Sequence, residues 1–410
     1  MCSQEIAGLF ASDFNEFCRT VVEKGECEFY NRVKQKQNLT VEAKKAIADL
    51  KQRGPLHNKE VTEFCREQRM CSYEISAAMA KNATVIIGDY YYIFNPFIRS
   101  TLFSKMEVEL EDAIVVVDEG HNLPARITDM LSSSLSNITL KNAVMEAKKF
   151  GFQGLIFWLQ ELMHILVELA DFTSQNSTGE IKERLVSKEQ LASKIALVVN
   201  YDEFINELEL AAIEVRLKQK KSYLGGISSF LEAWKGEDAG FTRIISEKEG
   251  KFSPILELSY ACLDPQIVTR DIFNRIHAGV VMSGTLKPLF MYKDILGIER
   301  GIEKEYGSPF PAENKLSLVI PETTTKYDLR GEAMYKRIAA ICSELALATP
   351  GNMAFFFPSY SLRDKVAQFF QSPKRLFYEQ KELASEEKEQ FLARFRAEKE
   401  KGGVLLGVSG

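Results

Sequence analysis

The sequence predicts an α/β protein whose parallel strands are interrupted by a long helical segment. The β-branched runs at residues 114–117 and 280–282 each end abruptly in polar residues, as expected for strands buried on both faces of a parallel sheet. Residues 128–268 instead show helical periodicity and little strand signal. Beyond residue 305, strand-like and helix-like segments alternate, which predicts βαβ units and a second α/β domain.

The first 80 residues contain most of the cysteines and have mostly helical patterns, with a break at Gly54-Pro55. Residues 84–87 are another apolar run and predict a further buried strand. An aromatic-rich turn follows this run and ends at Asn95-Pro96. We therefore expect one α/β domain that surrounds the helical segment.

The second α/β domain is expected after a proline-rich linker at residues 308–314. Its predicted strands are residues 315–320, 352–358, 374–379 and 403–410, and its predicted helices are residues 333–348, 361–371 and 384–401. Because the last of these strands ends the chain, we expect it to lack a covering element.

Length and charge restrict the class of protein. The 410 residues, 27% of them charged, suggest two to four domains of ordinary soluble composition. The net charge of −5 disfavours a protein that coats nucleic acid, although a local basic groove is compatible with it. No apolar run approaches the roughly 20 residues that span a bilayer, and the N-terminus lacks a signal-peptide pattern. We expect a cytoplasmic protein without a membrane segment.

Basic residues gather in two places. Either solvated helix faces or phosphate contacts would explain these groups. The first group comprises Lys44, Lys45, Lys51, Arg53, Lys59, Arg66 and Arg69, and the second comprises Arg216, Lys218, Lys220 and Lys221.

Five of the seven cysteines lie within the first 71 residues. In a cytosolic chain, such clustering favours a metal or cluster site over disulfides. The remaining two, Cys262 and Cys342, have apolar neighbours and are expected to be core residues.

Asp118 and Glu119 follow the first buried strand directly, in the stretch Asp-Glu-Gly-His that ends at His121. Two carboxylates at the carboxyl end of a strand suit a nucleotide hydrolase, in which the first helps to hold Mg²⁺ and the second polarises the attacking water. A polar turn without catalytic function is the alternative. The second strand-end motif, Ser283-Gly284-Thr285, favours the functional interpretation.

The order of motifs along the chain resembles that of superfamily-two helicases, in particular the iron–sulphur helicases of the XPD type. Their second motif usually reads Asp-Glu-Ala-His, so Gly120 is a mild departure. Residues 283–288 are similar to the third motif, residues 354–360 to the fourth, and residues 403–410 to the beginning of the fifth. The resemblance implies RecA-like motor domains, with Asp118, Glu119 and His121 in the ATP site and with Ser283 and Thr285 in a sensor between that site and the DNA groove.

The resemblance also implies a 4Fe–4S cluster held by four cysteines. The sequence contexts of Cys2, Cys27 and Cys71 are similar to the family's, and Cys18 is the remaining ligand candidate. Cys65 would be spare, although it is an alternative to Cys71. A Cys₄ zinc site is the other metal-based possibility, but the chain has no Cys-x-x-Cys pair to support it.

The resemblance implies five segments. Residues 1–82 would form a helical iron–sulphur domain, and residues 128–268 a helical arch domain. Residues 83–127 and 269–304 would be the two parts of the first motor domain. Residues 305–410 would belong to the second.

None of the 24 glycines belongs to the Gly-x-x-x-x-Gly-Lys-Ser/Thr loop that neutralises nucleotide phosphates. In the family this loop precedes the iron–sulphur domain, and the arginine-bearing sixth motif follows the fifth. We therefore expect the chain to be a fragment, with an incomplete first motor domain and a truncated second one, and to be inactive alone.

As a family member, the chain would belong to a monomeric 5′→3′ DNA helicase of DNA repair, with ATP, Mg²⁺ and single-stranded or forked DNA as ligands. Possible base-stacking or DNA-facing residues are Phe29, Tyr30, Tyr90, Tyr91, Tyr92, Tyr327 and Arg330, for which simple packing is an equal alternative. A DinG-type helicase is the alternative within the class. A non-motor iron–sulphur DNA-binding module is the alternative outside it.

Overall fold

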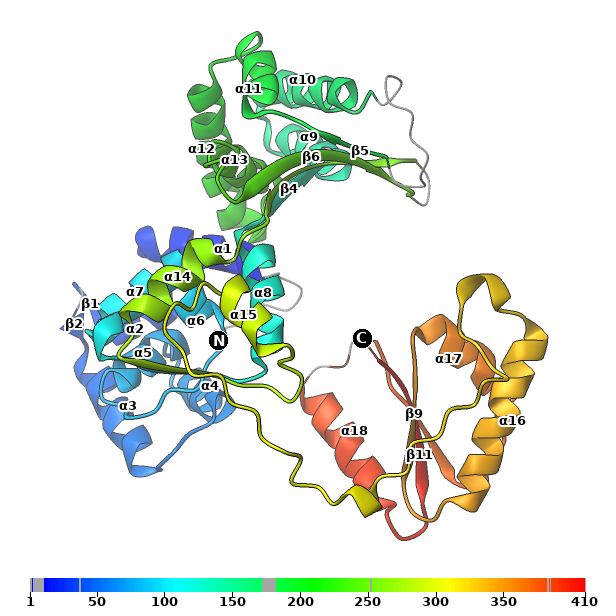
Figure 1. Cartoon of the computed structure of the whole chain (residues 1–410). Coiled ribbons are helices and arrows are strands. Elements are labelled where there is room, and N and C mark those ends of the chain that lie inside the picture. The colour runs from blue at the N-terminus through cyan, green and yellow to red at the C-terminus, as the bar shows by residue number, and fades with distance from the viewer. Residues whose placement is uncertain are drawn as a thin grey trace. The chain divides into compact units, whose positions relative to one another are not determined.

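The structure is a computed structural model that describes residue 2 and residues 11–36, 38–171, 182–250, 253–381, 383 and 385–409. The chain divides into two compact units, Met1–Lys304 and Glu305–Gly410 (Figure 1). Four sheets are present among the described residues, and none of them has strands from both units. No described helix is long and apolar enough to cross a membrane.

The cysteine-bearing part of the first unit is helical, as predicted. Its elements are α1 (Ala11–Glu23), α2 (Glu28–Val33), α3 (Val41–Gln52), α4 (Asn58–Glu67) and α5 (Ser72–Ala80), with a short antiparallel pair β1 (Lys34–Gln35) and β2 (Asn38–Leu39). Thr40 caps α3, and a capping box formed by His57 and Glu60 begins α4. A small core that includes Val33, Leu50 and Ile75 holds α2, α3, α4 and α5 together.

A two-stranded parallel sheet lies in the same unit. Strand β3 (Ile114–Val117) pairs with β8 (Ala278–Val281), so that Val117 is opposite Val281. The neighbouring elements are α6 (Tyr91–Phe94), α7 (Pro96–Met106), η1 (Leu110–Asp112), η2 (Gly120–Asn122), α8 (Leu123–Leu131), α14 (Gln266–Arg275) and α15 (Leu289–Ile295). Side chains of α6, α8 and α14 cover one face of the sheet. Ile114 and Val116 on the other face are 68% and 59% exposed.

The strand predicted at residues 84–87 is wrong. These residues have no regular secondary structure, and Ile87 is 96% exposed. A strand needs a neighbour to satisfy its N–H and C=O groups. Within the described residues β3 pairs with β8 alone, so the apolar run finds no strand to extend.

The segment expected to be a helical arch is an α+β structure rather than an all-helical one. It contains α9 (Asn137–Phe150), α10 (Gln153–Leu169), α11 (Lys188–Ala196), α12 (Tyr201–Gln219) and α13 (Tyr223–Trp234). It also contains an antiparallel sheet in the order β4-β7-β6-β5, made of β4 (Ser133–Ser136), β5 (Lys182–Leu185), β6 (Phe241–Lys248) and β7 (Ile255–Cys262). Residues 172–181, 251 and 252 of this segment lie outside the described residues.

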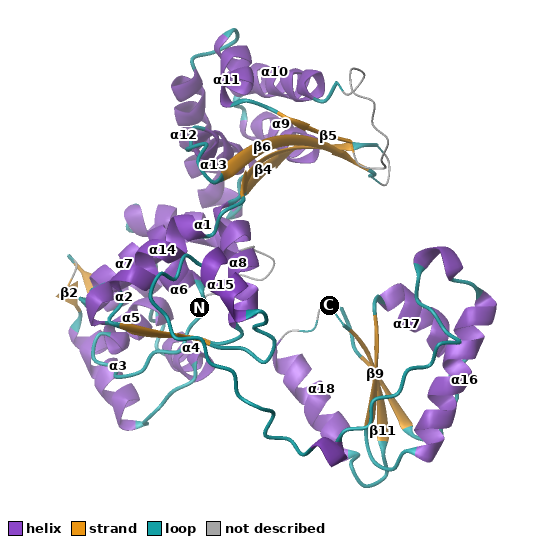
Figure 2. Cartoon of the chain, viewed as in Figure 1, coloured by secondary structure: helices purple, strands orange, loops and turns teal. Residues whose placement is uncertain are grey.

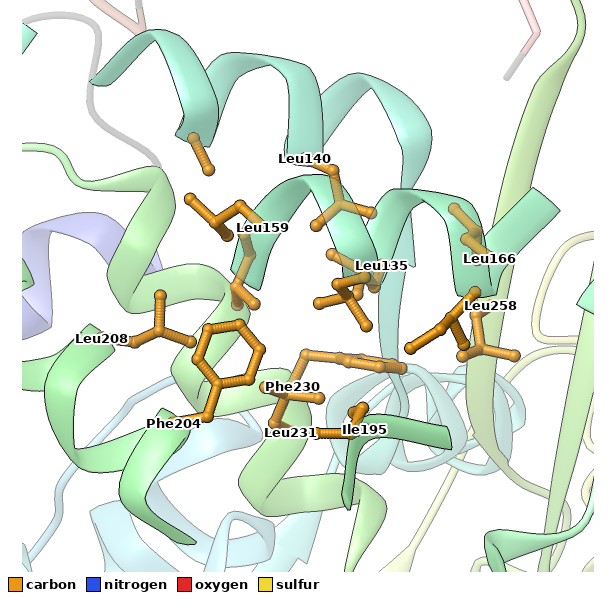
Figure 3. Packing of buried hydrophobic residues seen from close by; sticks show 14 of the residues in the cluster. Leu135, Leu140, Leu159, Leu166, Ile195, Phe204, Leu208, Phe230, Leu231 and Leu258 are labelled. Atoms are coloured by element: carbon orange, nitrogen blue, oxygen red, sulfur yellow. The ribbon is translucent and has the colours of Figure 1, made fainter. Parts of the chain in front are cut away.

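The largest core of the molecule fills this inserted region. Apolar side chains from α9, α10, α11, α12 and α13 and from β4, β6 and β7 pack into one core, part of which Figure 3 shows. Among them are Leu140 of α9, Leu159 of α10, Phe204 of α12, Phe230 of α13 and Leu258 of β7. The region therefore has a hydrophobic core of its own, between the sheet and the helices.

The second unit is a three-layer α/β structure (Figure 2). Its parallel sheet has the order β10-β11-β9, with β9 (Met353–Phe357), β10 (Arg375–Tyr378) and β11 (Gly403–Val408). Helices α16 (Glu332–Ala348) and α17 (Tyr360–Ala367) pack on one face, and α18 (Ser385–Ala397) packs on the other through Phe391 and Phe395 against Phe377. Two short 3₁₀ turns, η3 (Ala312–Asn314) and η4 (Tyr327–Leu329), precede α16.

Two expectations for this unit are wrong. Residues 315–320 form no strand and are exposed. The three described strands of this sheet all come from later in the chain. The last strand, β11, is not left uncovered. It is central and buried, because β9 and β10 flank it and helices lie on both faces. Residue 384, the first of the predicted helix at 384–401, and residue 410, the last of the predicted strand at 403–410, lie outside the described residues.

Candidate nucleotide and cysteine sites

The carboxyl ends of β3 and β8 bring the two polar motifs of the first unit together. The Met282 amide donates to the Val117 carbonyl at 2.9 Å, and the Gly120 amide donates to the Met282 carbonyl at 2.9 Å. These bonds continue the parallel ladder past the last strand residues. The Asp-Glu-Gly-His turn is therefore held directly against the Ser-Gly-Thr turn, 162 residues later in the chain.

The Ser283 hydroxyl is the centre of a hydrogen-bonded group at this strand edge. Its Oγ lies 2.7 Å from His121 Nδ1 and 3.3 Å from the Glu119 carboxylate, to which it donates. The Thr285 amide donates to the same Oγ at 3.1 Å. His121 Nδ1 is also 3.3 Å from Glu119 Oε2, which makes an ion pair when the imidazole is protonated. Four of the five predicted site residues thus form one connected group.

Glu119 has a left-handed backbone conformation, with φ of +49°. This conformation is uncommon for a residue with a side chain and marks local strain. The Tyr90 hydroxyl supports the turn by donating to the Asp118 carbonyl at 2.5 Å and to the Glu119 carbonyl at 3.2 Å. Burial and the nearby charges of Asp118 and Glu119 raise the pKa of Tyr90, so the phenol stays a donor.

Gly120 lies where the two turns approach most closely. A β-carbon at this position would be 2.4 Å from Val281 Cγ1 and 3.4 Å from the Met282 carbonyl oxygen. Contacts under 3 Å force a shift of the neighbouring atoms. Because position 120 has no side chain, the Val281 side chain can occupy the space that a β-carbon at this position would need.

Asp118 and Glu119 present exposed carboxylates at this edge, and the Glu119 amide donates to Asp118 Oδ1 at 2.9 Å. No group of three or more His, Cys, Asp or Glu side chains in the described ranges is placed to bind a metal ion. Mg²⁺ in nucleotide sites takes only one or two carboxylates, with phosphate oxygens and water completing its shell. The two carboxylates fit that limited role, with Asp118 nearest the strand end.

The four candidate cluster cysteines come from separate segments. Cys18 lies on α1, Cys27 directly precedes α2, and Cys71 directly precedes α5. The Cys71 amide donates to the Phe29 carbonyl at 3.0 Å, which ties the segment of Cys71 to that of Cys27. Cys2 is the one described residue before position 11.

The pKa values of two of these thiols are raised. Burial raises the pKa of the Cys18 thiol to about 11, with further contributions from Cys2, Cys27 and the Glu74 carboxylate. Burial likewise raises the pKa of the Cys71 thiol to about 12, and the charges of Glu74 and Cys18 add to the effect.

Four cysteine thiolates are the donor set that a 4Fe–4S cluster takes. Each iron of such a cluster takes one thiolate at a corner of the cube, so the four sulphur atoms surround the cluster instead of meeting at one ion. A tetrahedral zinc site would need four thiolates around a single point. The described side chains do not provide such a convergence.

Cys65 differs from these four cysteines. It is fully buried on α4 among the apolar side chains of Val33, Leu50 and Val61. Burial alone raises the pKa of its thiol to about 11, with no contribution from another cysteine. Its surroundings are those of a core residue, and Cys262 and Cys342 are likewise buried.

The second basic group is not a single solvated surface. Arg216 is only 1% exposed and contacts Glu209 at 2.9 Å and also Glu16 of α1. Gly225 leaves the space that the guanidinium occupies, since a β-carbon there would lie 1.9 Å from Arg216 Nη2. Arg216 is therefore a buried structural residue. It belongs neither to a solvated helix face nor to a phosphate-binding surface, the two interpretations made from the sequence.

The aromatic DNA candidates have mixed surroundings. Tyr90 packs on the Asp118–Glu119 turn, as described above, whereas Phe29 and Tyr30 are half-buried near Cys27. In the second unit, Tyr327 is exposed and the Arg330 guanidinium lies 5.4 Å from its ring centre. Among these candidates, Tyr327 and the half-buried Arg330 form an aromatic–cation pair of the kind that stacks on bases.

Sequence reasoning missed the supporting roles of Tyr90, Glu74 and Lys105. Lys105 on α7 contacts the buried carboxylate of Glu74 on α5. The one signal in the sequence is a charged residue inside the otherwise apolar stretch of α5. No sequence pattern indicated that Tyr90 supports the Asp118–Glu119 turn, because its partners are backbone carbonyls about 28 residues away.

Two family models match the chain. The model described as DEAD_2 matches residues 3–140, which include the Asp-Glu-Gly-His turn. The model described as helicase C-terminal domain matches residues 342–410. These matches and the curated relatives support an XPD-type superfamily-two helicase. The motif order that predicted an XPD-type chain is thereby confirmed.

Curated relatives of the XPD type span several organisms. The chain is 22% identical to the general transcription and DNA repair factor IIH helicase subunit XPD/RAD3 of Saccharomyces cerevisiae, over 84% of this chain and 52% of that protein. It is 24% identical to the ATP-dependent DNA helicase XPD of Sulfolobus acidocaldarius, over 75% of this chain and 52% of that protein. The chain therefore spans about half the length of these relatives.

Solved structures of XPD-type proteins share the fold. A structure titled XPD_Helicase has a TM-score of 0.55 at 19% identity. The match covers 99% of this chain and 65% of the chain in that structure. The structure of S. tokodaii Xpd4 has a TM-score of 0.50 at 18% identity. The match covers 81% of this chain and 64% of the chain in that structure. At these identities the likeness concerns the mixed α/β fold alone.

Proposed function

We propose that the chain provides part of the motor of an ATP-dependent 5′→3′ DNA helicase that unwinds duplex DNA in DNA repair. The observation that carries the proposal is the hydrogen-bonded group at the ends of β3 and β8, in which Ser283 connects Glu119 with Thr285. Such a group can transmit a change at the carboxylates to the neighbouring turn. This is what a motor needs when nucleotide hydrolysis drives movement on DNA.

In this proposal Asp118 holds Mg²⁺ together with the phosphates of ATP, and Glu119 orients and deprotonates the attacking water. His121 and Ser283 hold the Glu119 carboxylate in place through the contacts at 3.3 Å. Thr285 senses the state of the site from the next turn. The phosphate loop that this mechanism also requires is not present among the 410 residues.

We also propose a role for each segment. Residues 1–82 hold the 4Fe–4S cluster through Cys2, Cys18, Cys27 and Cys71. Residues 83–127 and 269–304 belong to the first motor domain, residues 128–268 form the arch, and residues 305–410 belong to the second motor domain. The hydrogen bond from the Cys71 amide to the Phe29 carbonyl, which joins the segments of Cys71 and Cys27, supports the first assignment, and the division into two compact units at Lys304 supports the last.

Strand separation tests the proposed function. A protein that joins this chain to a phosphate loop and a sixth motif from a relative should unwind forked DNA and duplexes with a 5′ single-stranded tail when MgATP is present. It should not unwind duplexes that carry only a 3′ tail. Unwinding of both kinds of duplex without ATP, or binding of DNA with no unwinding at all, would favour a non-motor iron–sulphur module instead.

A further inference from the structure

Five lysines gather where two helices of the inserted region end. The last turn of α9 contributes two of them, and the end of α12 with the two residues after it contributes three. Four of these lysines are exposed and one is half-buried. This group, which we call the lysine patch, comprises Lys148, Lys149, Lys218, Lys220 and Lys221.

The ring of Phe150 lies beneath two of these ammonium groups. Lys149 Nζ is 5.1 Å and Lys218 Nζ is 5.4 Å from the centre of this ring. Phe150 is half-buried and stacks on Phe152, with 6.4 Å between the ring centres. Because a cation is attracted to the face of an aromatic ring, Phe150 holds both long side chains in place.

The same arrangement recurs at the next two lysines of the patch. Lys221 Nζ lies 5.1 Å from the ring centre of Tyr223. Lys220 Nζ lies 6.0 Å from the ring centre of Phe17 on α1. Both rings are half-buried. Basic and aromatic side chains are therefore interleaved over a surface that extends from α9 across the end of α12 to α1.

Carboxylates offset only part of the positive charge of the lysine patch. Glu214 pairs with Lys218 at 2.8 Å, and Asp13 pairs with Lys221 at 3.1 Å. Lys149 instead donates a hydrogen bond of 2.8 Å to the uncharged amide of Gln219. Since the lysines outnumber these two carboxylates, the surface is locally positive in a chain whose net charge is −5.

Lys220 has a backbone conformation that suits glycine. It caps the C-terminus of α12 with φ of +63°, in the left-handed region. Helices that end in this way usually have glycine at this position, because a β-carbon makes the conformation costly. Strained residues of this kind cluster at sites that bind ligands. A lysine at this position therefore indicates a use for its charge.

Compensation of the helix dipole is the alternative explanation of the lysines. Positive side chains in a last turn stabilise the partial negative charge of a helix C-terminus. This explains Lys148, Lys149 and Lys218, which lie in last turns. It explains neither the interleaved aromatic rings nor the strained conformation of Lys220.

We propose that the lysine patch and its neighbouring aromatic rings bind single-stranded nucleic acid. The lysines contact the phosphates, and the rings of Phe150 and Tyr223 offer apolar surface to the bases. Proteins that bind single strands without sequence preference combine these same two elements, a positively charged path and aromatic side chains. Lysines already held over rings lose little freedom on binding, which favours affinity. The choice of DNA as the strand rests on the proposed function, whereas the site rests on the lysine patch.

Fluorescence anisotropy of the 410-residue chain tests the lysines. The probe is a labelled oligothymidylate of about 16 nucleotides, the upper end of common single-strand site sizes. Lys218→Ala and Lys220→Gly should each weaken binding about three- to fivefold, the usual strength of an exposed charge contact. Each should also reduce the slope of log affinity against log salt concentration by about 0.7, the value for one phosphate contact.

Lys194→Ala is the matched control for Lys218→Ala. Lys194 lies in the last turn of α11 and pairs with Glu168 at 2.6 Å, so the control also removes a last-turn lysine from a glutamate partner. It should change neither the affinity nor the salt slope.

Phe150→Leu tests the contribution of the rings. This variant keeps an apolar side chain and all the lysines of the patch. It should weaken binding about fivefold, the lower end of the effect of base stacking, and leave the salt slope unchanged.

Melting temperature separates the loss of binding from a loss of folding. Lys220→Gly should not lower it, because glycine adopts the left-handed conformation without strain, and Lys220→Arg should keep the parent affinity. A parent chain that does not bind the oligothymidylate, or lysine variants that bind as well as Lys194→Ala, would overturn the proposal. Binding of polyglutamate in place of the oligonucleotide would also overturn it and assign the patch to an acidic protein segment. Strand separation remains the separate test of the proposed function.

Discussion

At position 120 the chain has glycine, where helicases of this family usually have alanine. The structure gives the physical reason, since Val281 of the neighbouring strand fills the space that an alanine methyl group would need. The two positions are therefore expected to vary together. The exchange leaves Asp118, Glu119 and His121 in place, so it does not alter the groups that carry the chemistry.

Gly120→Ala tests this pairing at the scale of a residue. We expect it to lower the free energy of unfolding by about 1–3 kcal/mol, the usual cost of overpacking. Val281→Ala in the same chain should remove most of that cost, because the new methyl group then has room. Urea unfolding of both single variants and the double variant gives the coupling. Additive effects of the two substitutions would contradict the predicted contact.

Most of the nucleotide-site candidates could be found from the sequence, because each follows directly after a strand that its β-branched residues identify. The group centred on Ser283 joins Glu119, His121 and Thr285 as parallel pairing of β3 and β8 requires. Tyr90 and Glu74 could not be assigned their contacts in this way. Their partners are distant in the chain, and no periodic pattern predicts which side chains meet across elements.

At the scale of elements, the helices were predicted best. Those of the second unit follow from periodicity and caps, whereas two apolar runs, at residues 84–87 and 315–320, proved not to be strands. An apolar run becomes a strand only where another strand pairs with it, and pairing is not encoded locally. Conversely, β7 has alternating buried and half-buried residues, a strand pattern that the surrounding helical periodicity concealed.

The contact between α1 and the α12–α13 hairpin is the element-scale feature most open to test. Arg216 reaches from α12 to Glu16 of α1, and Ser229 of α13 donates to the same carboxylate at 3.1 Å. Lys221 adds a further ion pair with Asp13 at 3.1 Å. The helix that bears Cys18 is therefore fixed to the inserted region through a buried arginine.

Gly225→Ala should break this contact, because its methyl group would collide with the Arg216 guanidinium. We expect a loss of about 3 kcal/mol in the free energy of unfolding, as for a broken buried ion pair. In an Arg216→Met background the same substitution should cost less than about 1 kcal/mol, because alanine is otherwise favoured over glycine in a helix. Chemical unfolding of the four chains measures the difference. An equal cost of Gly225→Ala in both backgrounds would refute the steric explanation.

At the scale of the whole molecule, the chain combines two kinds of site in its first unit. We propose that the carboxylate edge of β3 and β8 takes Mg²⁺ and a nucleotide, and that the four cysteines hold an iron–sulphur cluster. The chain matches the DEAD_2 model over its N-terminal third and the helicase C-terminal domain model at its other end. A motor protein of the XPD type accounts for both sites and both matches.

The turnover of ATP by Glu119→Gln tests this account most directly, measured with single-stranded DNA on the chain joined to a phosphate loop and a sixth motif. Glutamine keeps the size of the side chain and accepts the Ser283 hydrogen bond, but it cannot take a proton from water. We predict a fall in turnover of about 10²–10⁴-fold, the usual contribution of a general base, with MgATP affinity nearly unchanged. Asp118→Asn, as the matched control, should weaken MgATP binding instead. Wild-type turnover in Glu119→Gln would contradict the assignment of this strand edge as the ATP site.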